Sequence, residues 1–361
     1  MQKKKILFSA HDPGGYNLLD PLIDELLKED LFDVYLLLIG PALVRARMKE
    51  VYAPLLKELN VFPIDGYENE SDIDFSLYSE IFNEISPDVV FVSTSINSNI
   101  ERYSIHLARL NQKPSFVYID SWTGDNVRFV SNRIEVTPDQ IIVCDELMAE
   151  PYRKFESLGS IIHVIGNLHL ENLYQFRYTR KRNNYRKSIN VLFVTENIAH
   201  YYPKALVNEY VIVSEILRSY NIPQQITLTI RPHPLESRNE WTKFISDNYS
   251  KNEFIRIVLD ESSSISSALS NSEMVIGIST MALIESSILG IPTFSYQNNI
   301  IDRSMLYIPY DLYNIHIIKF SDLFSEIIQN LETFQNDNTQ FTFPFLGAKK
   351  KMLSLLKSYA G

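Results

Sequence analysis

The sequence contains a single cysteine, Cys144, among 361 residues. One cysteine forms no internal disulfide and cannot supply the several thiolates of a cysteine-rich zinc site. The spacing of histidines and glutamate that marks zinc hydrolases is also missing, and the acidic pair Asp72 and Asp74 does not follow a buried strand. We therefore expect an intracellular protein that needs no metal and no cofactor.

Long apolar runs are missing as well. The longest, residues 34–44, contains Gly40 and Pro41 and is far shorter than the roughly 20 residues that cross a bilayer. The apolar stretch after the N-terminal lysines is too short for the core of a signal peptide. We expect a cytoplasmic protein, and peripheral contact with the inner face of the membrane is the alternative suggested by the basic segment 177–187.

The sequence has fewer basic than acidic residues. It contains 34 lysines and arginines and 44 aspartates and glutamates, which gives a formal net charge of −10. This balance argues against a nucleic-acid-binding surface, which neutralises many phosphates. A phosphorylated small ligand can still bind in a local basic pocket. The length suits two α/β domains, and the hydrophobic content of 45% suits ordinary globular cores.

Short runs rich in valine, isoleucine, leucine and phenylalanine alternate with longer amphipathic stretches. The runs are apolar at both odd and even positions, as in strands that are covered on both faces, so the alternation predicts doubly wound parallel sheets. The expected strands are 6–9, 34–39, 89–92, 116–119, 140–143, 162–165, 190–194, 226–230, 255–259, 274–278, 293–296 and 316–319. The expected helices are 18–27, 42–59, 77–85, 100–110, 204–220, 264–269, 281–289 and 323–331.

A change of composition divides the chain. The segment 177–187 is basic and has no apolar period, and a new strand pattern begins directly after it. We expect an N-terminal domain at 1–170, a linker at 171–188 and a C-terminal domain at 189–345. The last segment, 346–361, is expected to be a helix that packs back against the first domain.

In open parallel sheets, ligands bind beyond the carboxyl ends of the strands, near the point where the strand order reverses. The first expected strand is followed by His11, Asp12, Gly14 and Gly15, in a turn that leads into a helix. Glycines let a backbone approach a ligand closely, and either His11 or Asp12 could take a proton from a substrate hydroxyl. The alternative is a tight turn in which Asp12 caps the helix.

Two further strands end in polar loops. Asp120, Ser121 and Trp122 follow the strand at 116–119, and a tryptophan there is either a platform for a sugar or base or a packing residue. The loop formed by Thr195, Glu196 and Asn197 follows the first strand of the second domain. It is expected to contact donor or acceptor, or else to cap the start of a helix.

The strongest pattern lies in the second half. The strand at 226–230 is followed by Arg231, Pro232, His233 and Pro234, where the prolines stiffen the turn. Arginine and histidine at a strand end can stabilise a phosphate leaving group, whereas the alternative is an ion pair and a structural histidine.

A second motif belongs with this turn. The strand at 274–278 runs into Ser279 and Thr280 and then into a helix that carries Glu285. Hydroxyls and free helix N–H groups form an anion site, and Glu285 could hold a ribose hydroxyl pair. An ordinary Ser/Thr cap is the alternative.

Together these residues resemble a known group of enzymes. The run RPHP, Asp260 with the serines at 262–264, and the run GISTMALIESSILGIPTFSY are similar to the C-terminal half of bacterial GT-B glycosyltransferases. These include sialyltransferases and polysialyltransferases, Kdo transferases of capsule synthesis and CDP-glycerol glycerophosphotransferases, and UDP-GlcNAc 2-epimerases share the general layout. The resemblance covers about residues 190–300 and is mostly at the level of the fold before that.

The resemblance implies a GT-B fold, in which two Rossmann-like domains face a central cleft. It implies that His233, Ser279 and Thr280 contact the phosphate of a cytidine nucleotide and that Glu285 contacts the ribose. The sialyltransferases carry a catalytic acidic residue in a D/E-D/E-G pattern, where this sequence has His11-Asp12-Pro13-Gly14. Asp12 is therefore the first choice for the base and His11 the second.

From the sequence we expect a metal-independent glycosyltransferase. It would move a CMP-activated nonulosonic or Kdo-like acid from the nucleotide donor to a bacterial surface glycan, either free or lipid-linked, of capsule or lipopolysaccharide. Three alternatives remain open. They are a CDP-polyol phosphotransferase, a UDP-sugar 2-epimerase or hydrolase that needs no acceptor, and a non-catalytic module that binds a nucleotide sugar.

Overall fold

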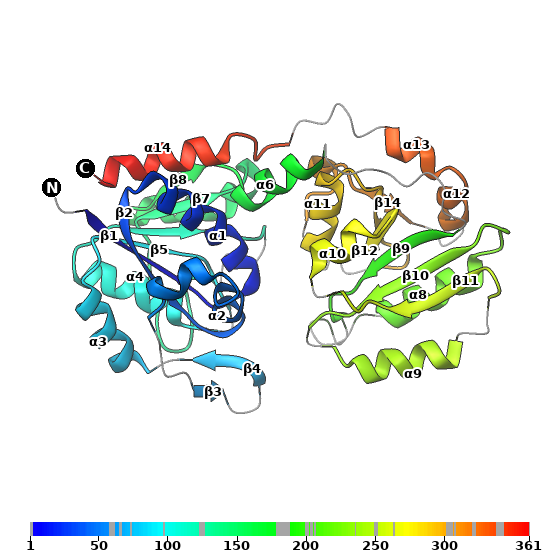
Figure 1. The fold of residues 1–361 in the computed structure, drawn as a ribbon, viewed down its shortest axis with the longest axis horizontal. Helices are drawn as coiled ribbons and strands as arrows, with labels where there is room; N and C mark the ends of the chain where they lie inside the picture. Colours follow the sequence, from blue (N-terminus) through cyan, green and yellow to red (C-terminus); the bar gives the residue numbers. More distant parts are fainter. Residues whose placement is uncertain are drawn as a thin grey trace. The chain divides into compact units, whose positions relative to one another are not determined.

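The computed structural model describes residues 3–57, 62–64, 67–72, 74–96, 98–122, 127–177, 188–198, 202, 205, 207–234, 236–248, 252–262, 264–300, 306, 308–319, 323–336 and 343–360. The expected linker at 171–188 lies largely outside the described residues, because 178–187 are not among them. The chain divides into two compact units. Unit 1 comprises Met1–Asn172 and Pro344–Gly361, and unit 2 comprises Leu173–Phe343 (Figure 1).

Unit 1 is built on a six-stranded sheet in the order β2-β1-β5-β6-β7-β8, in which all neighbouring strands are parallel. The strands are β1 (Lys4–Ala10), β2 (Phe32–Leu38), β5 (Val89–Val92), β6 (Ser115–Tyr118), β7 (Gln140–Val143) and β8 (Ile161–Val164). The helices are α1 (Pro13–Glu29), α2 (Gly40–Ala46), α3 (Phe75–Ile85), α4 (Ile100–Leu110), α5 (Glu146–Ala149), α6 (Leu168–Phe176) and α14 (Ala348–Ala360), with 3-10 turns at Glu50–Leu55 and Glu150–Leu158. A short antiparallel hairpin of β3 (Phe62–Ile64) and β4 (Tyr67–Asp72) was not expected.

Unit 2 repeats this plan with the order β11-β10-β9-β12-β13-β14, again parallel throughout. Its strands are β9 (Ile189–Val194), β10 (Ile226–Arg231), β11 (Ile255–Leu259), β12 (Met274–Gly277), β13 (Thr293–Tyr296) and β14 (His316–Ile318). Its helices are α8 (Glu209–Ser219), α9 (Arg238–Asn248), α10 (Ile265–Ser270), α11 (Met281–Ile288), α12 (Leu323–Gln329) and α13 (Leu331–Asn336), with a 3-10 turn at Asp311–Tyr313.

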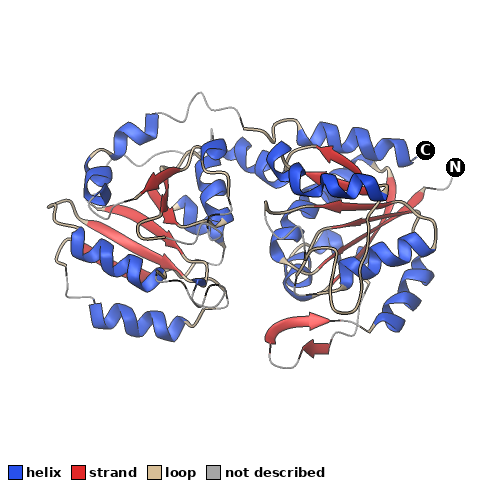
Figure 2. Cartoon of the chain, turned by 180° about the vertical axis from the view of Figure 1, so that it is seen from behind, coloured by secondary structure: helices blue, strands red, loops and turns tan. Residues whose placement is uncertain are grey.

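Helices lie on both faces of each sheet (Figure 2), which explains why the strand runs are apolar at both parities. The prediction of two doubly wound parallel-sheet units is confirmed, and every expected strand is present to within two residues. One expected helix, 42–59, is wrong, because it is split into α2 and the 3-10 turn at Glu50–Leu55. Pro54 lacks the N–H that a continuous α-helix would need at that position.

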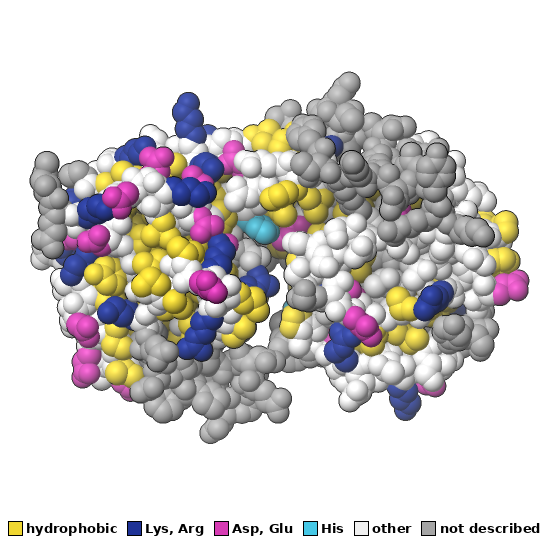
Figure 3. Space-filling model, viewed as in Figure 1, with side chains coloured by type: hydrophobic (Ala, Val, Ile, Leu, Met, Phe, Trp, Pro, Cys, Tyr) yellow, Lys and Arg dark blue, Asp and Glu magenta, His cyan; other side chains and the backbone are white. Residues whose placement is uncertain are grey.

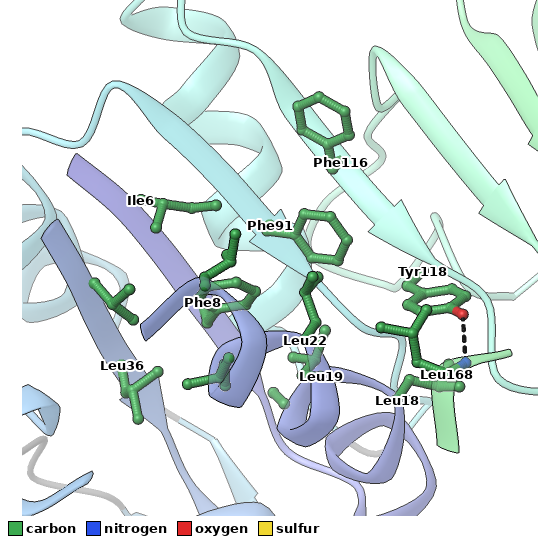
Figure 4. Packing of buried hydrophobic residues seen from close by; sticks show 14 of the residues in the cluster. Ile6, Phe8, Leu18, Leu19, Leu22, Leu36, Phe91, Phe116, Tyr118 and Leu168 are labelled. Carbon is green, nitrogen blue, oxygen red and sulfur yellow. Dashed lines mark hydrogen bonds between the residues drawn. The ribbon is translucent and has the colours of Figure 1, made fainter. Parts of the chain in front are cut away.

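The core of unit 1 joins the two ends of the chain. Phe8, Phe91 and Phe116 pack in a row under α1, and Tyr118 accepts a hydrogen bond from the backbone N–H of Leu168 at 3.1 Å (Figure 4). Helix α14 adds three fully buried side chains to the same core, namely Ala348, Met352 and Leu356. The final helix therefore belongs to the hydrophobic core of the first unit, 170 residues or more after the rest of that unit ends.

The face of unit 1 drawn in Figure 3 carries lysines and arginines interspersed with aspartates and glutamates. Among the exposed ion pairs of unit 1 are Arg153 Nη2 with Glu146 Oε2 at 2.7 Å and Lys357 Nζ with Glu29 Oε2 at 3.0 Å. Exposed pairs of this kind contribute only about 0–1 kcal/mol each. Within the described ranges, no helix has the length and apolar character to span a bilayer.

The strand order of each sheet shows its switch point, which is the place where the order of the strands reverses. In unit 1 the chain moves from β1 to β2 on one side and later to β5 on the other, so the order reverses between β1 and β5. In unit 2 it reverses in the same way between β9 and β12. Ligands of doubly wound sheets bind beyond the carboxyl ends of the strands at such points. The loops after β1, β5, β9 and β12 are therefore the first places to look for a site.

Candidate functional site

The loop after β1 holds His11 and Asp12 in direct contact. His11 Nδ1 and Asp12 Oδ1 are 2.6 Å apart, and the histidine is only 1% exposed while the Asp12 side chain is 25% exposed. Gly40, at φ +55°, packs against the ring, because a Cβ there would lie 2.7 Å from His11 Nε2. The histidine is thus enclosed, and the aspartate is the member of the pair that solvent reaches.

The glycine turn at the start of α1 lies against the ends of two other strands. A Cβ at Gly15 would come within 2.3 Å of Ser93 Oγ, just after β5, and one at Gly14 would come within 3.0 Å of Asp120 Oδ2, after β6. Any side chain at Gly15 would therefore clash with the strand-end segment. The glycines therefore let the ends of β1, β5 and β6 meet, whereas the sequence predicted that they let the backbone approach a ligand.

Asp120 belongs to a buried charge pair. Its Oδ1 accepts from Arg128 at 2.6 Å and from the hydroxyl of Thr94 at 3.1 Å, and Arg128 also donates to Thr94. Arg128 is almost fully buried. This arrangement leaves Asp120 with its charge compensated and places it beside the glycine turn.

Ser121 and Trp122 continue the loop after β6, and both are partly buried. The indole N–H of Trp122 lies 3.1 Å from each carboxylate oxygen of Asp145, which also accepts from the backbone N–H of Met148 at the start of α5. Burial raises the pKa of Asp145 above its usual value. The hydrogen bond orients the indole along the ends of β6 and β7.

Glu101 was not expected from the sequence. It lies in the first turn of α4, is 3% exposed, and accepts the backbone N–H of His11 at 2.9 Å through Oε1. Its Oε2 has no hydrogen-bond partner among the described residues. Burial, followed by the negative charge of Asp12, raises the pKa of Glu101 to about 7. The signal available in the sequence was an acidic residue at a helix start directly after a strand-end loop.

The raised pKa of Glu101 predicts how the unfolding free energy changes with pH. Glu101 binds its proton more tightly in the folded chain than in the unfolded chain, where its pKa is near 4.3. The protonated side chain therefore stabilises the folded state at low pH. That contribution is lost as the pH rises from about 4 to about 7. Relative to the wild type, Glu101→Gln should gain about 2–3 kcal/mol of unfolding free energy between pH 5 and pH 8, measured by urea unfolding.

The control for this experiment is Glu80→Gln, since Glu80 is exposed on α3. It should give an offset from the wild type that does not change with pH. A constant offset for Glu101→Gln as well would show that Glu101 does not hold a proton in the folded protein.

In unit 2, Arg231 ends β10 and forms a hydrogen-bonded ion pair with Asp260 after β11. It also donates to the carbonyl of Ser262 at 3.2 Å. Burial opposes ionisation of Asp260, but donation from Ser262 and Arg231 outweighs it and holds the pKa of the carboxyl below its usual value. The Arg231 side chain is 25% exposed, against 5% for Asp260. The aspartate therefore anchors the guanidinium at the sheet end while part of it stays accessible.

His233 and Pro234 follow in a turn that is held by its backbone. The N–H of His233 donates to Thr195 Oγ1 and to Glu236 Oε2, both at 2.7 Å. The Thr195 hydroxyl also donates to Glu236, and Glu236 Oε1 accepts from the indole of Trp241 at 3.1 Å. Thr195 also donates to the carbonyl of Arg231 at 3.3 Å, so it brings Arg231 and His233 together. Glu236, which sequence reasoning missed, accepts from both Thr195 and His233 and holds the turn in place.

The loop after β9 reaches the start of α11. Glu196 Oε1 accepts the backbone N–H groups of Ile278 at 3.0 Å and of Ser279 at 2.5 Å. Asn197 has φ +59°, in the left-handed region that asparagine tolerates, and this turn returns the chain toward Glu209, which accepts the N–H groups of Glu196 and Ile198.

The two hydroxyl side chains at the start of α11 have different environments. Ser279 is fully buried, and its Oγ accepts from Tyr310 at 3.0 Å and from the N–H of Ile308 at 3.2 Å. Thr280 is partly exposed and caps α11 by accepting from Ala282 at 3.3 Å. Glu285 lies further along the same helix and is buried.

The expected partners Arg231 and Ser279 stand at the ends of β10 and β12, with β9 between them. Two strand spacings separate such positions by roughly 10 Å. The residues named in each unit therefore lie at the carboxyl ends of neighbouring strands, as separate contacts at and beside the switch point. Among the described residues, no group of three or more His, Cys, Asp or Glu side chains is arranged to hold a metal ion.

No family model matches the sequence, and no curated protein is significantly similar to it. Solved structures match over nearly the whole chain. A UDP-GlcNAc 2-epimerase from Neisseria meningitidis, bound to UDP-GlcNAc, has 14% identity and a TM-score of 0.67 over 98% of this chain and 100% of its own. The UDP-GlcNAc 2-epimerase from Methanocaldococcus jannaschii has 14% identity and a TM-score of 0.63 over 98% and 99%. MurG from Acinetobacter baumannii has 10% identity and a TM-score of 0.56 over 98% and 99%.

These similarities establish that the chain has the two-unit GT-B-like fold. They correct the function expected from the sequence. A transferase for a CMP-activated nonulosonic or Kdo-like acid, of the sialyltransferase type, is wrong, because the matched structures are mainly UDP-GlcNAc 2-epimerases and those with a named nucleotide carry UDP or UDP-GlcNAc. The resemblance misled because RPHP and the Ser-Thr turn were interpreted as phosphate contacts, and a phosphate contact does not distinguish one nucleotide base from another.

Proposed function

We propose that this protein is an enzyme that binds a UDP-sugar and acts at carbon 2 of the sugar, as a 2-epimerase or a related hydrolase. The observation that carries the proposal is the set of phosphate-competent groups at the carboxyl ends of β10 and β12, on either side of β9, in a fold shared over 98% of the chain with a UDP-GlcNAc 2-epimerase bound to UDP-GlcNAc. Sites of doubly wound sheets lie at this point.

Unit 2 would bind the diphosphate. Arg231 is anchored by Asp260 and is partly accessible. A guanidinium has five N–H donors, and Asp260 and Ser262 both accept from the same nitrogen, Nη1. His233 stands two residues further on, in a turn fixed by Thr195 and Glu236. Arginine is well suited to phosphate because its donors match two oxygens at once. Thr280 at the start of α11 would add a hydroxyl, and Glu285 would contact the ribose.

Unit 1 would supply the proton-transfer group. Epimerisation breaks the bond between carbon 2 and its hydrogen and forms a new one on the opposite face, so a base must accept a proton and a proton must return. Asp12 is accessible, whereas His11 is enclosed and lies 2.6 Å from it. We therefore assign the base to Asp12 and give His11 the part of a positioning residue that orients the carboxylate. Asp120, beside the glycine turn, would contact sugar hydroxyls.

The test has a binding arm and a chemical arm. Calorimetric titration with UDP and with CMP should give binding for UDP only. Proton NMR of UDP-GlcNAc incubated with the protein in D2O should then show deuterium entering at carbon 2, because the departing proton exchanges with solvent. UDP binding without exchange, but with release of free sugar, would favour the hydrolase. Binding of CMP in preference to UDP would reject the proposal.

A further inference from the structure

Glu196 places a carboxylate at the switch point of unit 2, where the diphosphate is proposed to bind. It belongs to the loop after β9, yet its Oε1 accepts the N–H groups of Ile278 and Ser279, which follow β12. The contact crosses from one strand end to the next and spans more than 80 residues of sequence. A carboxyl side chain of the protein thus already engages the backbone donors that lead into α11.

Hydrogen bonds to the start of α8 hold the loop after β9 in this position. Glu209, at the start of α8, accepts the N–H groups of Glu196 and Ile198, both at 3.0 Å. Other ionisable groups on the surrounding segments are Tyr310, whose hydroxyl contacts Ser279, Glu285 in α11, Arg231 with its partner Asp260, and His233 with Glu236. Carboxylates outnumber cations among them, so a further dianion meets repulsion unless one carboxylate gives up its charge.

We propose that Glu196 is an internal anion that competes with the ligand's diphosphate for the turn between β12 and α11, so that the diphosphate binds the form of the protein in which Glu196 carries a proton. This inference rests on the proposed function, because it takes the diphosphate to lie in unit 2. Glu196 is a positioning residue here, since it acts through the backbone donors and not on the reacting atoms.

The state of Glu196 near neutral pH is consistent with this competition. Burial raises the pKa of Glu196 to about 7, although hydrogen bonds from the N–H groups of Ser279 and Ile278 oppose the shift and the charge of Glu209 adds to it. Protonation at neutral pH is therefore within reach, and diphosphate binding raises the proton affinity further. Ligand binding should take up a proton, and affinity should fall as the pH rises above 7.

The experiment measures UDP-GlcNAc binding by calorimetry, with intact protein, at about pH 6 and about pH 8.5, in buffers of different ionisation enthalpy. The diphosphate diester has no ionisation of its own in this range. For the wild type we expect the dissociation constant to rise about thirtyfold from the lower to the higher pH, with proton uptake on binding. Glu196→Gln keeps an acceptor oxygen for both N–H groups, so it should bind without this pH dependence and more tightly than the wild type at pH 8.5.

The matched control is Glu253→Gln, an exposed glutamate of the same unit, which should keep the wild-type slope. If Glu196→Gln kept the same slope, or bound more weakly at every pH, Glu196 would be a structural cap and the competition would be refuted. Unfolding free energies at both pH values show whether the variant is folded. Failure of wild type and variant to bind at any pH would reject the proposed function together with this inference, whereas binding with an unchanged slope would reject the inference alone.

Discussion

Replacing Asp12 by asparagine should lower the rate of exchange at carbon 2 of UDP-GlcNAc by about 10²–10⁴-fold and leave UDP affinity unchanged. This is the range over which a positioned acid or base contributes to a rate. Asparagine has nearly the same shape, so it can keep the contact with His11 Nδ1 but cannot accept a proton from the substrate. Deuterium incorporation followed by NMR gives the rate, and calorimetry with UDP gives the affinity.

The control is Asp33→Asn, on an exposed position of β2 in the same unit. It should leave both quantities as in the wild type. Full exchange activity in Asp12→Asn would remove Asp12 as the base. If His11→Asn then abolished exchange while UDP still bound, the histidine would take that role despite its burial.

Replacing Arg231 by methionine should weaken UDP binding by about 10–100-fold. A hydrogen bond to a charged group contributes about 1.5–3 kcal/mol, and each 1.4 kcal/mol is a factor of ten in affinity. The substitution also leaves the Asp260 carboxylate without its cation in a buried position. Because the guanidinium is partly exposed, we expect an accompanying loss of about 1–2 kcal/mol in unfolding free energy.

A double substitution separates these two effects. Arg231→Met with Asp260→Asn removes the uncompensated charge, so stability should recover while UDP affinity stays low. Arg256→Met, at an exposed position of β11, is the matched control and should change neither. Recovery of affinity in the double variant would mean that Arg231 acts on the fold alone and does not contact the diphosphate.

The strands could be predicted because each is a local pattern. β9 and β12 are short, apolar at both parities and bounded by polar turns, and a strand of that kind can only be stable between two layers of helices. Helix boundaries were less predictable. The run at 42–59 has helical periodicity, yet Pro54 interrupts its backbone hydrogen bonds. Helix α9 was missed because its sequence, RNEWTKFISDN, is largely polar and buries mainly Trp241.

The candidate site was only partly predictable for a related reason. Residues at the carboxyl end of a strand, such as Asp12 and Arg231, can be found from the sequence, because the strand pattern itself shows where that end lies. Glu101 reaches it from the first turn of α4, and Glu236 from the turn before α9, by accepting the backbone N–H groups of His11 and His233. The nucleotide could not be predicted either, because the sequence motifs were interpreted as phosphate contacts, and phosphate is common to CMP and UDP.

The sequence by itself determined that two doubly wound units form and which loops lie at the carboxyl ends of their strands, since apolar periodicity and turn residues act over a few neighbouring positions. Only the tertiary structure decided which of those loops meet. Strand order in unit 2 places β9 between β10 and β12, and this order brings Glu196 to the N–H groups of Ile278 and Ser279. In unit 1, packing against Gly40 encloses His11 while Asp12 stays accessible. Such contacts depend on packing between segments far apart in the chain, and burial in that packing is what shifts the proton affinities of Glu101 and Glu196.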